Sequence, residues 1–137
     1  MRVINRTRGQ TLIERAVVAH TAMERRRGLI GRAALARGEG LVLPGTKSIH
    51  TFGMRFPIDV LFLDSEGNAI HLMGKIKRSR VSPLVWRSAM ALEMPPGILA
   101  QTGTELGDRI ELIEDDADPG AERSTENADR AASEGLV

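Results

Sequence analysis

Residues 48–64 read SIHTFGMRFPIDVLFLD, and this stretch decides the fold. A polar and aromatic segment leads through Pro57 into a run, residues 58–64, that is apolar at nearly every position. Such a run is typical of a strand that is covered on both faces, as central strands of a barrel or of a helix-covered sheet are. Residues 58–64 are therefore predicted to form the central strand of the core.

The segments on either side of this strand predict an antiparallel pairing. Residues 65–68, SEGN, have the composition of a tight turn, and residues 69–76, AIHLMGKI, return as a second strand of a hairpin. On the other side, residues 40–45, GLVLPG, predict a brief strand that its proline and glycine end. The middle of the chain is therefore predicted to be mostly strand.

Two strands and a short helix are predicted at the N-terminal end. Residues 2–5 and 12–20 are rich in β-branched residues, and the turn at Gly9 between them indicates a hairpin. Thr21 and Glu24 then have the spacing of a capping box, so a helix should begin at Thr21. Two glycines shortly afterwards should keep this helix short, because glycine weakens a helix interior.

The C-terminal part of the predicted fold consists of a strand, one or two helical turns and a final strand. Residues 88–97 alternate until Pro95 and Pro96, which cannot donate to a sheet ladder and must end the strand. Residues 97–103 can form one or two helical turns, and residues 107–114 alternate as a final strand.

Six or seven short strands with two small helices predict an α+β fold, a small β-rich domain whose mostly antiparallel sheet curls toward a barrel. A chain of 137 residues has the size of one domain, predicted here to cover residues 1–114. Residues 115–137 contain seven acidic residues, two arginines and no periodic apolar face. This composition predicts a disordered, acidic tail.

Composition excludes several classes of function. The chain has no cysteine, which excludes disulfides, thiolate nucleophiles, zinc–thiolate sites and iron–sulfur clusters. The first residues include arginines and no apolar run of leader length, and no apolar stretch is long enough to span a membrane. We therefore expect a cytoplasmic protein.

The sequence motifs of common enzymes and metalloproteins are missing. No phosphate-binding glycine loop, HExxH, GxSxG or EF-hand pattern occurs. The three histidines, at 20, 50 and 71, do not have ligand spacing on one element, so neither a metal nor a cofactor is expected.

Basic clusters leave open a second kind of function. Arginines occupy positions 25–27, and Lys75, Lys77, Arg78 and Arg80 form a second cluster that could contact phosphates. Nucleic acid is nevertheless disfavoured as a partner, because one tryptophan and no tyrosine cannot build a platform for stacking bases. A module that binds a protein or a nucleic acid through a basic face stays as the alternative function.

The order of several short motifs resembles an uncharacterised bacterial and archaeal family, number 192 among the domains of unknown function. The resemblance covers roughly residues 10–113 and implies a small, β-rich fold without an established activity. Relatives often carry an aromatic-Met-Lys-Asn-Thr sequence before the Pro-x-Asp step, whereas this chain reads HTFGM at residues 50–54. The matching elements are Gly28-Leu29 with Arg32, Gly40, Pro57-Ile58-Asp59, Leu92-Glu93 before Pro96-Gly97, and Gly107-Asp108.

The charged residues around residues 48–64 have a structural interpretation. Asp59 stands at the start of the buried strand, and a buried carboxylate without a partner would cost several kcal/mol. Arg27, Arg32 and Arg55 are candidate partners, with Asp59 and Arg32 forming a clamp. Glu93 could form a similar ion pair with another arginine.

The same region also has a functional interpretation, as a shallow pocket for a small polar ligand such as a sugar or a carboxylate. This favours a non-catalytic accessory or ligand-binding domain over an enzyme. A hydrolytic enzyme ranks third, because two carboxylates and a histidine can perform acid–base chemistry. The predicted ligand-binding residues are His50, Thr51, Met54, Arg55, Asp59, Trp86 and Glu93, with Phe52 as a further apolar wall.

Overall fold

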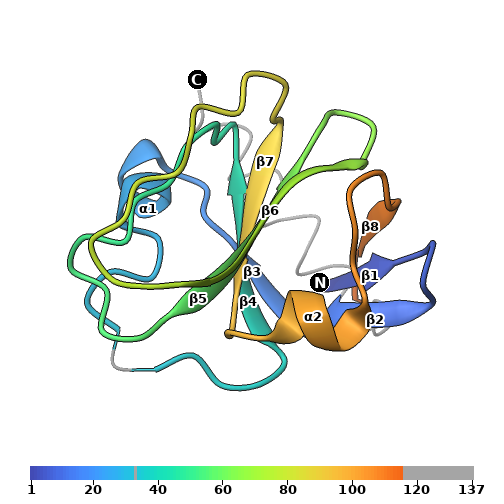
Figure 1. The fold of residues 1–137 in the computed structure, drawn as a ribbon, viewed down its shortest axis with the longest axis horizontal. Helices are drawn as coiled ribbons and strands as arrows, with labels where there is room; N and C mark the ends of the chain where they lie inside the picture. The colour runs from blue at the N-terminus through green and yellow to red at the C-terminus, as the bar shows by residue number, and fades with distance from the viewer. Residues whose placement is uncertain (33, 116–137) are drawn as a thin grey trace, which may run out of the picture.

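The computed structural model describes residues 1–32 and 34–115 and divides the chain into two sheets and two short helices (Figure 1). The acidic segment predicted as a tail, residues 115–137, lies outside the described residues except for Asp115. The elements in chain order are β1 Arg2–Asn5, β2 Gln10–Ile13, β3 Arg15–Val18, α1 Ala22–Arg27, β4 Glu39–Pro44, β5 Ile58–Leu63, β6 Ala69–Ile76, β7 Met90–Met94, α2 Ile98–Thr102 and β8 Ile110–Ile113.

The larger sheet has five strands in the order β3-β4-β7-β5-β6. All of its pairings are antiparallel except that of β3 with β4, which is parallel. All six residues of β5 are buried, as the unbroken apolar pattern predicts. The hairpin of β5 and β6 is also confirmed.

The smaller sheet has three antiparallel strands in the order β2-β1-β8. The single strand predicted over residues 12–20 is wrong, because the chain bends between β2 and β3 and the two segments join different sheets. The amides of Glu14 and Arg15 both donate to the carbonyl of Gly38, each at 2.9 Å, which holds this bend. Gly40 is required beside it, since a Cβ there would lie 2.5 Å from Cδ1 of Ile13.

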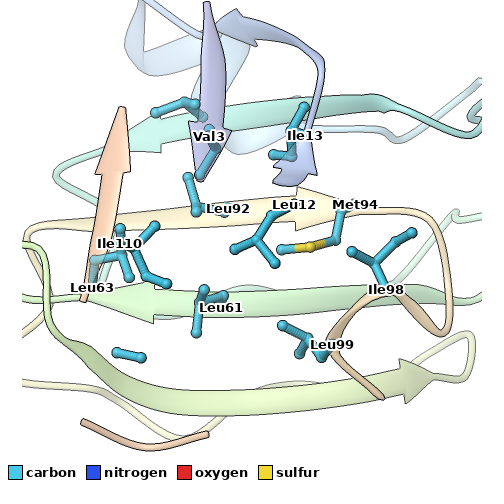
Figure 2. Close-up of a cluster of buried hydrophobic side chains, with 12 residues drawn as sticks. Val3, Leu12, Ile13, Leu61, Leu63, Leu92, Met94, Ile98, Leu99 and Ile110 are labelled. Atoms are coloured by element: carbon cyan, nitrogen blue, oxygen red, sulfur yellow. The ribbon is translucent and has the colours of Figure 1, made fainter. Parts of the chain in front are cut away.

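One hydrophobic core fills the space between the two sheets and α2. Figure 2 shows Val3 and Ile13 from the smaller sheet and Leu61 and Leu92 from the larger sheet in this cluster. Ile98 and Leu99 of α2 close it. This core holds the smaller sheet and α2 against one face of the larger sheet, and that face is therefore filled.

A second core covers the opposite face of the larger sheet, on the side of α1 and of the long connections before β5 and before β7 (Figure 1). It contains Leu29, Ile49, Phe62 and Ala91, all of them buried. The predicted capping box begins α1: the Thr21 hydroxyl accepts from the Glu24 amide at 3.0 Å, and the Glu24 carboxylate accepts from the Thr21 amide at 3.1 Å. Gly28 then ends the helix, so that α1 is short as expected.

The fold is therefore α+β and β-rich with two short helices, as predicted. The finer expectation of a sheet curled toward a barrel is not confirmed. Within the described residues the strands form two sheets and no closed barrel. The physical reason is the bend after β2, which places the first strands in a separate layer over the core.

Candidate functional site

Two buried carboxylates lie on neighbouring strands of the larger sheet but on opposite faces. Asp59 of β5 is paired in register with Met94, and Glu93 of β7 is paired with Val60. Since successive side chains of a strand point to opposite faces, Asp59 faces the core that contains Met94 and α2, while Glu93 faces the core that contains Val60. The two acids therefore do not line one cavity.

Asp59 is fully buried and accepts three backbone hydrogen bonds. Its Oδ1 accepts from the amides of Lys75 at 2.7 Å and Gly97 at 3.0 Å, and its Oδ2 accepts from the amide of Leu99 at 2.8 Å. The last two amides belong to the first turn of α2, which has no side-chain cap of its own. Asp59 thus caps α2 from a strand distant in sequence.

This geometry corrects the expected clamp of Asp59 with an arginine. Among the described residues no arginine forms an ion pair with Asp59, because backbone amides already satisfy its carboxylate. Arg32 instead pairs with Glu39 at 3.2 Å. The ion pair expected for Glu93 is also not formed within the described part of the chain, and neither Arg27 nor Arg55 makes one there.

Glu93 is buried as deeply as the core around it, with 4% of its surface exposed. Within residues 1–32 and 34–115, its Oε2 atom has no hydrogen-bond partner. Burial raises the pKa of Glu93 to about 7, and the backbone amide of Leu29 only partly opposes that rise. The carboxyl group is therefore a strong acceptor when ionised and a donor when protonated, and no described partner occupies Oε2.

Glu93 lies in the wall of a pocket between α1, the turn after it and the residues after β4. The volume of this α1–β7 pocket is about 440 Å³. Gly28 contacts the carboxylate at close range, since a Cβ on Gly28 would be 3.0 Å from Oε2 of Glu93 and 3.1 Å from Oε1. The pocket is lined by Arg25, Arg27, Gly28, Leu29, Ile30, Thr46, Lys47, Ser48, Ile49, His50, Met54 and Glu93.

The charges around Glu93 in this pocket are all basic. Arg25 is half-buried, and its Nη1 donates to the carbonyl of His20 at 3.3 Å, whereas Arg27 is exposed and makes no side-chain hydrogen bond within the described chain. Lys47 donates to the carbonyls of Trp86 at 2.8 Å and Ser88 at 2.9 Å. These bonds hold its positive charge beside the pocket.

Of the predicted ligand-binding residues, the pocket brings together His50, Met54 and Glu93. His50 is exposed and its ring lies 5.8 Å from that of Phe52 in a tilted pair. Met54 is buried and belongs to the second core, where it forms part of the apolar wall.

The other predicted ligand-binding residues are elsewhere. Thr51 is buried and bonds to the 77–80 segment, accepting from the Arg80 amide at 2.8 Å and donating to the Lys77 carbonyl at 2.7 Å. Arg55 is exposed outside the pocket lining. Trp86, 76% exposed, lines a separate hollow with Leu106.

Several pocket residues escaped the sequence interpretation. Arg25 was predicted only as part of the basic cluster at residues 25–27, and nothing in the sequence spacing places Gly28 and Lys47 beside it. The only usable signal was Glu93 itself, an acid within an apolar strand. Within the described ranges, no group of three or more histidine, aspartate or glutamate side chains could hold a metal ion, and no helix is long and apolar enough to cross a membrane.

Comparison with known proteins agrees with this fold. A UPF0127 protein from Thermococcus sibiricus is 32% identical over 120 residues, which cover 80% of this chain and 73% of that protein. A protein of unknown function from Novosphingobium aromaticivorans has a crystal structure that is similar with a TM-score of 0.72 and 22% identity, over 82% of this chain and 84% of that one. A Sinorhizobium meliloti protein, whose suggested role is transcription regulation, has a TM-score of 0.67 and 24% identity, over 80% and 89% of the two chains.

The family model for domain of unknown function 192, described as "Uncharacterized ACR", matches residues 3–112. The match covers both sheets, both helices and the α1–β7 pocket. Taken with the T. sibiricus relative, it shows that this chain belongs to the uncharacterised domain of unknown function family 192.

Proposed function

We propose that this protein is a binding domain for a small polar ligand, and that the α1–β7 pocket is its binding site. The observation that carries the proposal is Oε2 of Glu93, a buried oxygen without a partner in the described chain. Leaving such a group unsatisfied costs about 1–3 kcal/mol, and more when it is charged. A ligand that donates a hydrogen bond to Glu93 would recover that free energy.

The rest of the pocket suits a small molecule with polar and apolar parts. Its volume of about 440 Å³ is within the usual range of ligand pockets. Leu29, Ile49 and Met54 supply apolar walls, and Arg25 and Arg27 supply positive charge. Sugars and small organic anions have the matching polar groups.

We infer binding rather than hydrolysis because the two carboxylates are not assembled as a pair. Glycoside hydrolysis usually needs two carboxyl groups on either side of one bond. Asp59 faces the opposite side of the sheet and is saturated by backbone donors, so Glu93 would have to act with His50 alone. A non-catalytic binding role requires only an acceptor at Glu93, the basic side chains and the apolar walls of the pocket.

A screen of sugars and small organic anions against the full chain tests this proposal. Thermal-shift and ligand-detected NMR measurements should find compounds that stabilise the protein, and Glu93→Met or His50→Ala should weaken their binding. Trp86→Ala is the control, because its side chain lies outside the pocket. The proposal fails if no compound binds, or if binding persists unchanged in both pocket variants.

A second candidate function uses the basic segment at the end of β6 and in the connection that follows it. Lys75, Lys77, Arg78 and Arg80 are all exposed, and none of them forms an ion pair within the described chain. The S. meliloti protein of similar fold has a suggested role in transcription regulation, and DNA is therefore the anionic macromolecule chosen for the test. Fluorescence anisotropy with a DNA duplex at several salt concentrations would test it: this candidate requires salt-dependent binding that weakens in Lys77→Ala/Arg78→Ala and is unchanged in His50→Ala.

A further inference from the structure

Resting on the proposed function, we infer that the ligand of the α1–β7 pocket is a hydroxylated organic anion, bound by its hydroxyl at Glu93 and by its anionic group at Arg25 and Arg27. Short hydroxy acids and polyol phosphates share this chemistry. The inference follows from the division of the pocket into one buried acceptor and several basic side chains.

The surroundings of Glu93 favour a neutral donor over an ammonium group. Its neighbours across the sheet are Leu41 and Val60, and Leu29, Ile49 and Met54 are buried apolar residues of the pocket lining. An ammonium would lose its hydration there, and an ion pair in such surroundings recovers that loss only with further hydrogen bonds. A hydroxyl costs much less to bury.

A hydroxyl also matches both protonation states of Glu93. The carboxylate can accept from the hydroxyl hydrogen, and the protonated carboxyl group can donate to the hydroxyl oxygen. Because burial raises the pKa of Glu93 to about 7, both states are populated near neutral pH. An aliphatic ammonium has no acceptor for the proton of the neutral carboxyl group, and only the ionised state offers it a charged partner.

The basic side chains supply the second contact. Arg27 is exposed and has no acidic partner within the described chain, and only Nη1 of Arg25 is engaged, with the carbonyl of His20. Guanidinium groups bind carboxylates and phosphates through paired N–H donors. The titratable or charged side chains in the lining are those of Arg25, Arg27, Lys47, His50 and Glu93, so Glu93 is the one acid among them.

Matched three-carbon probes separate the two contacts in the wild-type chain. Isothermal titration at pH 7 would compare glycerate, which has both groups, with propionate, which has only the anion, and with glycerol, which has only hydroxyls. Glycerate should bind at least ten-fold more tightly than either. β-Alanine, with an ammonium in place of the hydroxyls, should bind no more tightly than propionate. Glycerol 3-phosphate against inorganic phosphate repeats the comparison for phosphate ligands and distinguishes the two sources of the anion.

Two variants assign the contacts, with chemical shifts reporting that each remains folded. Glu93→Met keeps a side chain of similar length but removes both carboxyl oxygens, so it should reduce the affinity of glycerate relative to propionate and of glycerol 3-phosphate relative to inorganic phosphate. Arg27→Ala should reduce the ratio of the affinity for glycerate to the affinity for glycerol. Trp86→Ala should leave both ratios unchanged.

The outcomes distinguish this inference from the proposed function. If glycerol binds as tightly as both hydroxylated anions, or β-alanine binds more tightly than propionate, the inferred ligand class is wrong while a small-ligand site remains. The ligand class is also wrong if uncharged sugars bind at the pocket and none of the hydroxylated anions does. If neither these probes nor uncharged sugars perturb the pocket resonances, the proposed function itself is wrong.

Discussion

Asp59 and Glu93 form a natural comparison, because they are two buried acids on adjacent strands of one sheet. Asp59 faces the core beneath α2 and accepts hydrogen bonds from three backbone amides. Glu93 faces the core beneath α1, where Oε2 has no partner in the described chain and an open pocket lies beside it. The two acids are therefore almost equally buried, but only Asp59 has both carboxylate oxygens bonded within the described chain.

The difference teaches that burial alone does not identify a functional acid. Asp59 is satisfied by the fold itself, so its charge stabilises α2 and leaves little capacity for a ligand. Glu93 is left unsatisfied, which costs stability unless another molecule supplies the donor. A saturated buried acid indicates structure, and an unsatisfied one beside a cavity indicates a site.

The largest expected effect is loss of stability in Asp59→Ala. Removing the carboxylate leaves three buried or half-buried amides without an acceptor, and we expect the free energy of unfolding to fall by about 3–5 kcal/mol. Urea denaturation at pH 7 measures this. Glu93→Gln is the comparison and should lose no stability at pH 7, because its neutral amide avoids the cost of burying an ionised carboxylate. Equal losses of unfolding free energy in the two variants would contradict the conclusion that Asp59 is structural and Glu93 is not.

Stability should also depend on pH through Glu93. The pKa of Glu93 is about 7 in the folded state and close to its ordinary value of 4.5 in the unfolded state, so the folded state holds more protons between these values. The free energy of unfolding should therefore fall as pH rises from about 4.5 to 7, by about 3 kcal/mol in total.

Urea titrations of the ligand-free protein at several pH values check this slope against Glu93→Gln, which lacks the titrating group. The wild-type protein should lose stability relative to the variant as pH rises. Parallel curves would show that Glu93 titrates normally and that the pocket is well hydrated.

Gly28→Ala should reduce stability by a smaller amount. This substitution tests the contact between the end of α1 and Glu93. Gly28 has φ +49°, and the added Cβ would press on the Glu93 carboxylate. We expect a loss of about 2 kcal/mol, together with weaker binding in the pocket. Gly45→Ala is a matched control, since Gly45 has φ +69° and open space around it, so only backbone strain applies. Thermal unfolding and ligand titration of both variants would show whether crowding at Glu93 adds to the strain.

The smallest effect is expected for Arg55→Ala. Arg55 is exposed, lies outside the pocket and forms no ion pair in the described chain. Stability and ligand affinity should stay within about 0.5 kcal/mol of the wild-type values. A larger loss of affinity would extend the site toward residues 52–57 and bring the original grouping of Arg55 with His50 back into consideration.

Local patterns predicted most of the elements but not how they assemble. The capping box at Thr21, the buried strand β5 and the hairpin to β6 depend on nearest neighbours in sequence, and all three are confirmed. The bend at Glu14 was missed because residues 12–20 contain no glycine or proline to mark a break between two strands. Only the pairing of β3 with β4 reveals that bend.

The candidate site was predictable only in part for a similar reason. Alternation shows that neighbours on one strand face opposite ways, but it does not give the register between β5 and β7. That register places Asp59 and Glu93 on different faces. The contribution of Arg25 and Lys47 also depends on contacts between segments distant in sequence.

The sequence by itself determined a β-rich chain with a buried strand predicted at residues 58–64, short helices and polar residues near the ends of the strands. It did so because periodicity, capping and turn chemistry act over a few residues. Only the tertiary structure decided that α2 would satisfy Asp59 and that Glu93 would face a pocket without an internal donor. Hydrogen-bond satisfaction is a property of groups brought together in space, and local sequence cannot specify it.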